Sequence, residues 1–202
     1  MGRMEKITGT ERLTAALADL AGGKPVILTG ASDGGPVMLV PGRDVTAAQV
    51  NRLTHEARGL VGIALPLRRA AELGLSLQPR RNCRRNLPLY TLSIEAVGVG
   101  TGISAGERAE TIRAAADPAA RAGAVVSPGH IFPQVVEPGL HGQAEGAVTL
   151  LRLAGCGDVA AICSMIGPDG GDLDTAAARV RAAALGLTAV DMADLPLTRS
   201  GG

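Results

Sequence analysis

The sequence predicts one α/β domain in which helices flank a mixed sheet. Its 202 residues fall within the size range of a single domain. Short apolar segments typical of strands alternate with amphipathic segments typical of helices, and no long linker separates two such groups. Since 46% of the residues are hydrophobic but the chain has no Trp, one Phe and one Tyr, the core should be aliphatic. We therefore expect one domain over residues 1–202.

The order of the elements follows from caps, glycines and the period of the apolar residues. Two apolar runs on either side of the glycine-rich segment 30–35 predict a hairpin, and Thr46-Ala-Ala-Gln49 is a capping box. Strands are expected at residues 25–29, 36–40, 60–65, 89–96, 125–126, 159–164 and 188–191. Helices are expected to begin at Thr10, Thr46, Pro66, Glu107, about Gln143 and Asp174.

Composition excludes several classes of partner. The net charge of +1 and the lack of aromatic stacking platforms argue against nucleic acid. No apolar run reaches the roughly 18 residues needed to span a bilayer, and Met1 to Thr10 lacks the apolar core of a signal peptide. We expect a soluble cytoplasmic protein. Three cysteines without paired spacing indicate neither a disulfide framework nor a structural metal.

Two polar, glycine-rich loops, around residues 98–108 and 127–146, are the predicted working site. Gly98 to Gly106 precedes a helix and offers backbone N–H groups with the hydroxyls of Thr101 and Ser104, which suits an anion or an ordinary tight turn. His130 lies between Pro128 and Pro133, where its loop position allows catalysis or a structural hydrogen bond.

A cluster of arginines, Arg80 to Arg85, forms a further polar segment. Such a run is usually a solvated loop. The alternative is a cover over an anionic ligand, to which Arg84 would contribute.

Three stretches resemble 3,4-dihydroxy-2-butanone 4-phosphate synthase, an enzyme family of riboflavin biosynthesis. They are Ile94-Glu-Ala-Val-Gly-Val-Gly-Thr-Gly-Ile-Ser-Ala-Gly-Glu-Arg108, Pro128-Gly-His-Ile-Phe-Pro133 and Glu145 to Gly155. The match continues in order along the chain to Asp191-Met-Ala-Asp-Leu195. The resemblance implies an α/β homodimer with active sites near the subunit interface. It also implies action on ribulose 5-phosphate with magnesium, and release of formate.

The chain departs from the family where the metal and the catalytic acids belong. In place of the acidic loop Asp-Asp-Glu-Asp-Arg-Glu-Asn-Glu-Gly-Asp it has residues 29–36, with Asp33 as the one carboxylate. The family's Arg-x-His-Thr-Glu-Ala aligns with His141 to Gly146, so that Gln143 replaces the ligand His. Ser164 aligns with the catalytic Glu. Magnesium requires hard oxygen ligands, usually carboxylates, so we expect no metal cofactor and loss of the parent reaction.

Two classes of function remain open. The first is a repurposed, metal-independent enzyme of lyase, isomerase or cyclase type, acting on a small polar carbonyl compound in a specialised biosynthetic pathway. The second is a noncatalytic homologue that binds a ligand or pairs with an intact synthase; residual synthase activity is a further alternative. The catalytic candidates are His130, Glu145, His141 and Asp33. The substrate-binding candidates are Thr101, Ser104, Gln143, Ser164, Tyr90 and Arg84.

For Glu145 the structural alternative is a charge that favours the helix N-terminus. We expect His130 and Glu145 to share one pocket with Thr101 and Ser104.

Overall fold

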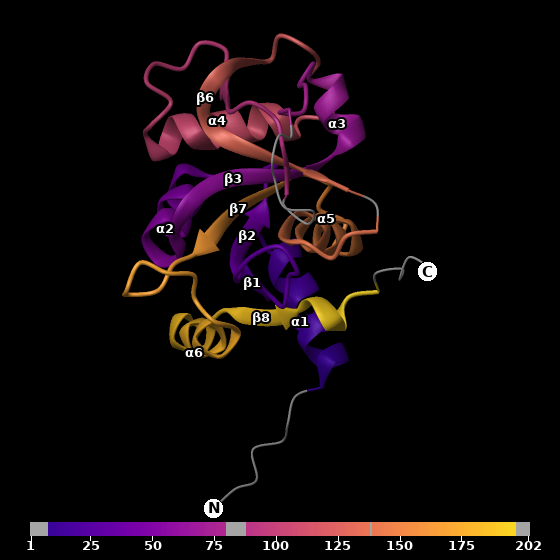
Figure 1. Cartoon of the computed structure of the whole chain (residues 1–202), viewed down its shortest axis with the longest axis vertical. Helices are drawn as coiled ribbons and strands as arrows, with labels where there is room; N and C mark the ends of the chain where they lie inside the picture. Colours follow the sequence, from indigo (N-terminus) through magenta and orange to yellow (C-terminus); the bar gives the residue numbers. More distant parts are fainter. Residues whose placement is uncertain (1–7, 80–87, 138, 197–202) are drawn as a thin grey trace, which may run out of the picture.

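A single eight-stranded mixed sheet forms the centre of the computed structural model, which describes residues 8–79, 88–137 and 139–196 (Figure 1). The strand order is β4-β6-β3-β7-β2-β1-β8, and β5 pairs with β6 beside this path. The pairs β3–β6 and β1–β8 are parallel, whereas the other pairs are antiparallel. The strands are β1 Val26–Thr29, β2 Val37–Pro41, β3 Arg58–Pro66, β4 Leu89–Tyr90, β5 Ile94–Ala96, β6 Val125–Val136, β7 Ala160–Met165 and β8 Thr188–Asp191.

Helices cover both faces of the sheet, which confirms the predicted mixed α/β fold. One apolar cluster lies under α2, α4 and α6, and a second lies under α1 and α5. The helices are α1 Gly9–Ala21, α2 Ala47–Ala57, α3 Leu67–Glu72, α4 Ala105–Ala116, α5 Gln143–Leu153 and α6 Thr175–Leu185, and a short 3-10 helix, η1, spans Met192–Asp194. Among the described residues, no helix is long and apolar enough to cross a membrane.

Capping boxes set the start of several helices. Thr46 and Gln49 cap α2 as predicted. The first helix begins earlier than expected, because Thr8, rather than Thr10, accepts from the N–H of Glu11 while the Glu11 carboxylate accepts from Thr8. The hairpin of β1 and β2 is confirmed by its antiparallel register.

The prediction of a loop at residues 127–133 is wrong, because this segment is part of the twelve-residue strand β6. Its prolines and glycine favour a loop locally, but Ile131 and Val135 bury their side chains in the core. A register shift between Ile94 and Glu95 accommodates the irregular first half against β5. The predicted strand 89–96 is divided into β4 and β5.

The arginine-rich segment around Arg84 lies outside the described residues.

Candidate functional site

Strand β6 carries polar side chains on the sheet face that lies under α1 and α5. Ile131 and Val135 belong to the core under α2 and α4, so the alternate residues Gln134 and His130 point to the opposite face. Tyr90 on β4 pairs with Gln134 and therefore lies on that same face. The strand thus connects two groups of polar residues, one at each end.

The first group, named the α5 cluster, consists of Asp33, Tyr90, Gln134, Gln143 and Glu145. Asp33 lies in the turn between β1 and β2, and its carboxylate accepts from the backbone N–H of Gln143 at 2.8 Å. The Gln143 amide donates to the carbonyl of Gly35 at 2.7 Å and is 5% exposed. Two hydrogen bonds therefore join the β1–β2 turn to the start of α5.

Glu145 holds the segment that leads into α5. Its carboxylate accepts from the backbone N–H groups of Glu137 at 2.7 Å and Gly142 at 3.0 Å. Burial raises its pKa, and the charge of Asp33 adds to this effect. Both carboxylates crowd Gly142, where any larger side chain would collide with them. These contacts support a structural role for Glu145 at the start of α5.

Tyr90 and Gln134 are hydrogen-bonded to each other near Asp33. The Gln134 side-chain amide donates to the Tyr90 hydroxyl at 2.9 Å. Burial raises the pKa of Tyr90, with a smaller effect from the charge of Asp33, so the hydroxyl keeps its proton at neutral pH. Burial likewise raises the pKa of Asp33. This end of the face therefore combines a protonated phenol with a carboxyl group that takes up a proton more readily than usual.

The second group, named the His130 cluster, consists of Glu95, Thr101, Ser104, Glu107 and His130. His130 is exposed and pairs through Nδ1 with the Glu95 carboxylate. Gly102, at φ +69°, brings the 98–104 loop against the same carboxylate. A carboxylate that orients an exposed imidazole is an arrangement suited to proton transfer.

The 98–104 loop does not offer its donors to an external anion, because Glu107 already binds them. The Glu107 carboxylate accepts from the N–H groups of Gly100 at 2.8 Å and Thr101 at 3.2 Å. It also accepts from the hydroxyls of Thr101 and Ser104. Ser104 caps α4 in return. The contacts support the tight turn rather than the anion site.

The two clusters do not form one pocket within the chain. Glu137, to which Glu145 is bound, lies seven positions after His130 along extended backbone, or about 23 Å at about 3.3 Å per residue. Among the described residues, no hydrogen bond joins the two groups. We predicted one pocket for these residues on the assumption that residues 127–133 form a loop. The structure has them in strand β6, and this separates His130, Thr101 and Ser104 from Glu145.

The remaining predicted residues lie near the α5 cluster or on the same face. The backbone carbonyl of His141 accepts from Ser32, and its side chain is half-buried. Ser164 is half-buried on β7, where it pairs with Val37. The alternate residue Ile162 belongs to the core under α1 and α5, so Ser164 points to the face that carries Gln134.

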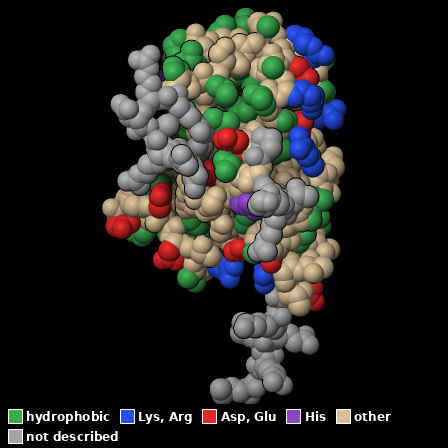
Figure 2. Space-filling model, turned by 45° about the vertical axis from the view of Figure 1, so that its right-hand side comes forward, with side chains coloured by type: hydrophobic (Ala, Val, Ile, Leu, Met, Phe, Trp, Pro, Cys, Tyr) green, Lys and Arg blue, Asp and Glu red, His purple; other side chains and the backbone are tan. Residues whose placement is uncertain are grey.

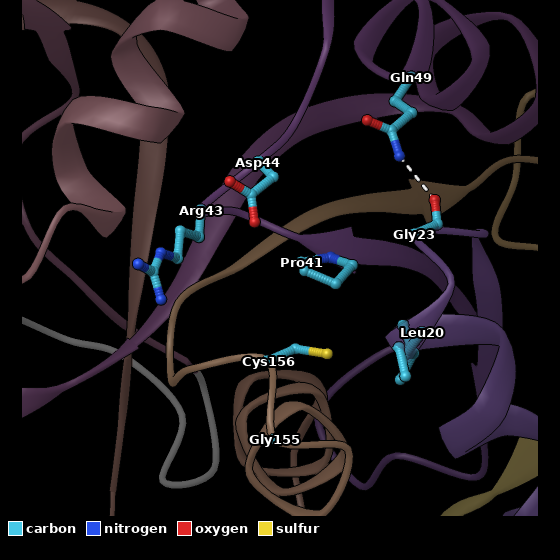
Figure 3. A pocket seen from close by; sticks show the side chains of 9 residues that line it. Leu20, Gly23, Pro41, Arg43, Asp44, Gln49, Gly155 and Cys156 are labelled. Carbon is cyan, nitrogen blue, oxygen red and sulfur yellow. Dashed lines mark hydrogen bonds between the residues drawn. The ribbon is translucent and has the colours of Figure 1, made fainter.

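A cavity of about 350 Å³ lies elsewhere, near the ends of α1 and α5 (Figure 3). Arg43, Asp44, Gln49 and Cys156 line it, and the Gln49 amide donates to the carbonyl of Gly23. A more open hollow of about 450 Å³ lies between Arg43 and the end of α4. Neither contains a residue of the two clusters.

The α5 cluster does not fit a magnesium ion. Asp33 already accepts the N–H of Gln143, and Glu145 uses its two oxygens on backbone donors. No group of three His, Cys, Asp or Glu side chains with metal-binding geometry occurs among residues 8–79, 88–137 and 139–196. One carboxylate and one amide are a weak set for a hard cation that retains its water tightly.

Comparison with known proteins establishes the family. Residues 14–197 match the family model of 3,4-dihydroxy-2-butanone 4-phosphate synthase. The chain belongs to this family. A protein of that name from Ralstonia nicotianae is 39% identical over 166 residues, which cover 79% of this chain and 73% of the relative.

Two solved structures share the fold. A two-domain 3,4-dihydroxy-2-butanone 4-phosphate synthase from A. baumannii superposes with a TM-score of 0.85 at 33% identity, covering 91% of this chain and 56% of that one. A 3,4-dihydroxy-2-butanone 4-phosphate synthase in complex with two magnesium ions gives a TM-score of 0.83 at 25% identity, covering 90% and 93%. The synthase fold is therefore present although, by the resemblance, the family's acidic loop is reduced here to Asp33 and Gln143 stands in place of the ligand His.

Three residues of these clusters escaped the sequence-based prediction. Glu107 could have been found, because Ser104-Ala-Gly-Glu107 is itself a capping box. Gln134 interrupts the apolar run from Ile131 to Val136, which is a weaker signal. Glu95 gave no signal, since its pairing with His130 arises only from the register of β5 against β6.

Proposed function

We propose that this chain is an enzyme that acts on a small, polar, carbonyl-bearing compound at the α5 cluster. The supporting observation is the Asp33–Gln143 hydrogen bond near the protonated Tyr90 hydroxyl, on the sheet face that lies under α1 and α5. A carboxyl group with a raised pKa and a neighbouring phenol can move a proton at, and orient, a carbonyl group. Two reactions are candidates for this site.

The first candidate is the reaction named in the relatives, which makes 3,4-dihydroxy-2-butanone 4-phosphate. The match over residues 14–197 and the 39% identity to the Ralstonia protein favour it directly. The family resemblance supplies its substrate, ribulose 5-phosphate, and its second product, formate. This candidate requires metal-dependent chemistry, for which Asp33 and Gln143 are a weak ligand set.

The second candidate is a metal-independent reaction of lyase, isomerase or cyclase type. The engagement of Glu145 by two backbone N–H groups favours it, since that carboxylate then positions the chain rather than a cation. In this reaction Asp33 is the acid/base group, while Tyr90 and Gln143 orient the substrate. His130 and His141 are further acid/base candidates.

One assay separates the candidates. The purified chain and the Ralstonia relative are incubated with ribulose 5-phosphate and magnesium, and formate is followed by NMR. From the side chains we expect formate release at least about 10²-fold slower than that of the relative, the scale for loss of a positioned acid or base. A rate equal to that of the relative would establish the synthase reaction and overturn the metal-independent one.

Calorimetry tests the metal directly. We expect no micromolar affinity for magnesium or manganese, because Asp33 and Gln143 together offer one charge. Micromolar binding that Gln143→Ala abolishes would contradict the metal-independent candidate. Binding of carbonyl compounds without turnover of any of them would instead identify a noncatalytic homologue.

The family resemblance further leads us to propose a cytoplasmic homodimer. Apolar side chains are exposed over the upper part of the face shown in Figure 2. Four large hydrophobic side chains that are exposed, Leu92, Val97, Ile103 and Val126, come from the segments around β5 and from the start of β6. Light scattering should give twice the chain mass, and Val126→Asp should halve it. A monomer of the unaltered chain at micromolar concentration would refute the dimer.

A further inference from the structure

We propose that the cavity near the ends of α1 and α5 is a second binding site, which takes a free aliphatic α-amino acid. In this site Asp44 binds the ammonium group, Arg43 binds the carboxylate, and the apolar wall around Leu20 holds the side chain. The site does not depend on the proposed reaction. It lies at the opposite end of α5 from Gln143, about 16 Å away for a helix of 11 residues at about 1.5 Å per residue.

The first observation is a pair of opposite charges that do not neutralise each other. Arg43 and Asp44 are neighbours in the chain, both are exposed, and both line the cavity. Among the residues that the structure describes, neither side chain forms an ion pair or a hydrogen bond. In Figure 3 the charged ends of the two side chains lie apart. This wall of the cavity therefore offers one free cation and one free anion, which is the complement of a zwitterion.

The second observation is that the backbone between β2 and α2 holds these two residues in place. The N–H of Gly42 donates to the carbonyl of Val159 at 2.8 Å. Val45 is 1% exposed, and its carbonyl accepts from the Arg113 side chain at 2.7 Å. The two charged residues are thus fixed from both sides while their side chains reach the cavity. A backbone that is ordered before binding lowers the entropy that binding costs.

The third observation is an uncharged wall in the same cavity. Four of the lining residues are small or apolar: Leu20, Ala21, Pro41 and Cys156. Figure 3 shows Leu20 on the side away from Arg43. Burial raises the pKa of the Cys156 thiol, and the charge of Asp44 adds to this effect, so the thiol stays uncharged at neutral pH. The volume of about 350 Å³ suits a small molecule that is charged at one end and apolar at the other.

These features together select the ligand. The carboxyl ends of α1 and α5 lie at the cavity and favour a positive charge, which places the ammonium group beside Asp44. An aliphatic acid lacks the cation for Asp44, and an aliphatic amine lacks the anion for Arg43. An aliphatic side chain does not suit the neighbouring hollow, which shares both charges, because further charged residues line it: Glu110, Arg113 and Asp117.

The test compares L-leucine with three compounds that each lack one of its groups. Isocaproate lacks the ammonium group, isoamylamine lacks the carboxylate, and glycine lacks the aliphatic side chain. Binding of each compound to the full chain is measured by NMR titration. We expect L-leucine to bind at least about tenfold more tightly than each of the others, since each loses charge-assisted hydrogen bonds or buried apolar area.

Variants then assign the preference to the two charges. Asp44→Asn should weaken the binding of L-leucine to about that of isocaproate, and Arg43→Gln should weaken it to about that of isoamylamine. Both side chains are exposed, so the melting temperature should stay that of the unaltered chain. Glu110→Gln is the matched control, because Glu110 is exposed and lines the neighbouring hollow rather than the cavity, and it should leave the binding unchanged.

Four results would overturn the proposal. The first is no binding of L-leucine at about 10 mM, and the second is equal binding of L-leucine and the three truncated compounds. The third is an affinity for L-leucine that survives both Asp44→Asn and Arg43→Gln. The fourth is a loss in Glu110→Gln as large as that in Asp44→Asn, which would put the ligand in the neighbouring hollow. The titration needs no turnover, so a failure of the proposed reaction is distinguishable from a failure of this site.

Discussion

The two ends of strand β6 hold polar residues in different ways. In the His130 cluster, the turn residues Thr101 and Ser104 bond to Glu107, a few positions along the chain. In the α5 cluster, Asp33 bonds to Gln143, which is 110 positions away. The first set of contacts is local and exposed, while the second is long-range and partly buried.

This difference distinguishes a turn that is stabilised by its own residues from a group of polar side chains that only the fold brings together. A glycine-rich loop ahead of a helix has the composition of an anion site, but Glu107 fills it from within the same motif. The α5 cluster brings together the β1–β2 turn, β4, β6 and α5, which are distant in the sequence. The α5 cluster is therefore the proposed site, and variants at each end of β6 test the comparison.

The largest effect is expected from Glu145→Ala. The change leaves the N–H groups of Glu137 and Gly142 without their buried acceptor, and it should lower the free energy of unfolding by about 2–4 kcal/mol. Denaturant unfolding measures it. Glu110→Ala, on the exposed surface of α4, is the control and should change stability by less than about 0.5 kcal/mol. If Glu145→Ala lowers the free energy of unfolding no more than this control does, Glu145 has no structural role.

His130→Ala should leave stability nearly unchanged, in contrast to Glu145→Ala. His130 is exposed, so its loss should change stability by less than about 0.5 kcal/mol. If the proposed dimer surface brings it to a working site, turnover in whichever reaction the assay detects should fall by roughly 10²-fold. Thermal melts accompany the kinetics. A melting temperature several degrees lower with unchanged turnover would make His130 a structural residue.

Ser104→Ala should cost about 1 kcal/mol of stability, the usual scale for loss of an N-cap. Its KM should stay that of the unaltered chain, because the hydroxyl is bound to Glu107. Thr101→Val, in the same loop but outside the cap, should cost less. A rise in KM at constant stability would instead return Ser104 to the substrate-binding residues.

Most of the fold could be predicted because its signals are local. The capping box Thr46–Gln49 and the apolar runs of β1 and β2 depend on neighbouring residues. The segment 127–133 could not be predicted, since its prolines favour a loop and only pairing with β3 and β5 makes it a strand.

The candidate site was less predictable, because its contacts join residues that are far apart in the sequence. Asp33 and Gln143 were found through the family motif, and the structure joins them. Gln134 was not predicted, because its hydrogen bond to Tyr90 forms only once β4 lies against β6. His130 and Glu145 belong to one motif series in the sequence, yet the length of β6 separates them.

The smallest effect is expected from Asp33→Asn, and it appears in the pH dependence of stability. Burial raises the pKa of Asp33 above its ordinary value, so the folded chain binds a proton more tightly than the unfolded chain does. Relative to Asp33→Asn, the unaltered chain should therefore gain stability as pH falls through the range just above the ordinary Asp value of about 4. It should lose that gain as pH rises toward 7. Asp33 is only partly buried, which limits the size of the change.

The measurement is a series of denaturant titrations of both proteins between about pH 4 and 7, compared as a difference so that other titrating groups cancel. Asp174→Asn is the matched control, because the Asp174 carboxylate is exposed and caps the start of α6. A difference for Asp33→Asn that grows in favour of the unaltered chain as pH rises would mean that the Gln143 N–H stabilises the charged carboxylate more than burial destabilises it. Asp33 would then be an ordinary anchor of α5, and the acid/base role would have to pass to another group of the α5 cluster.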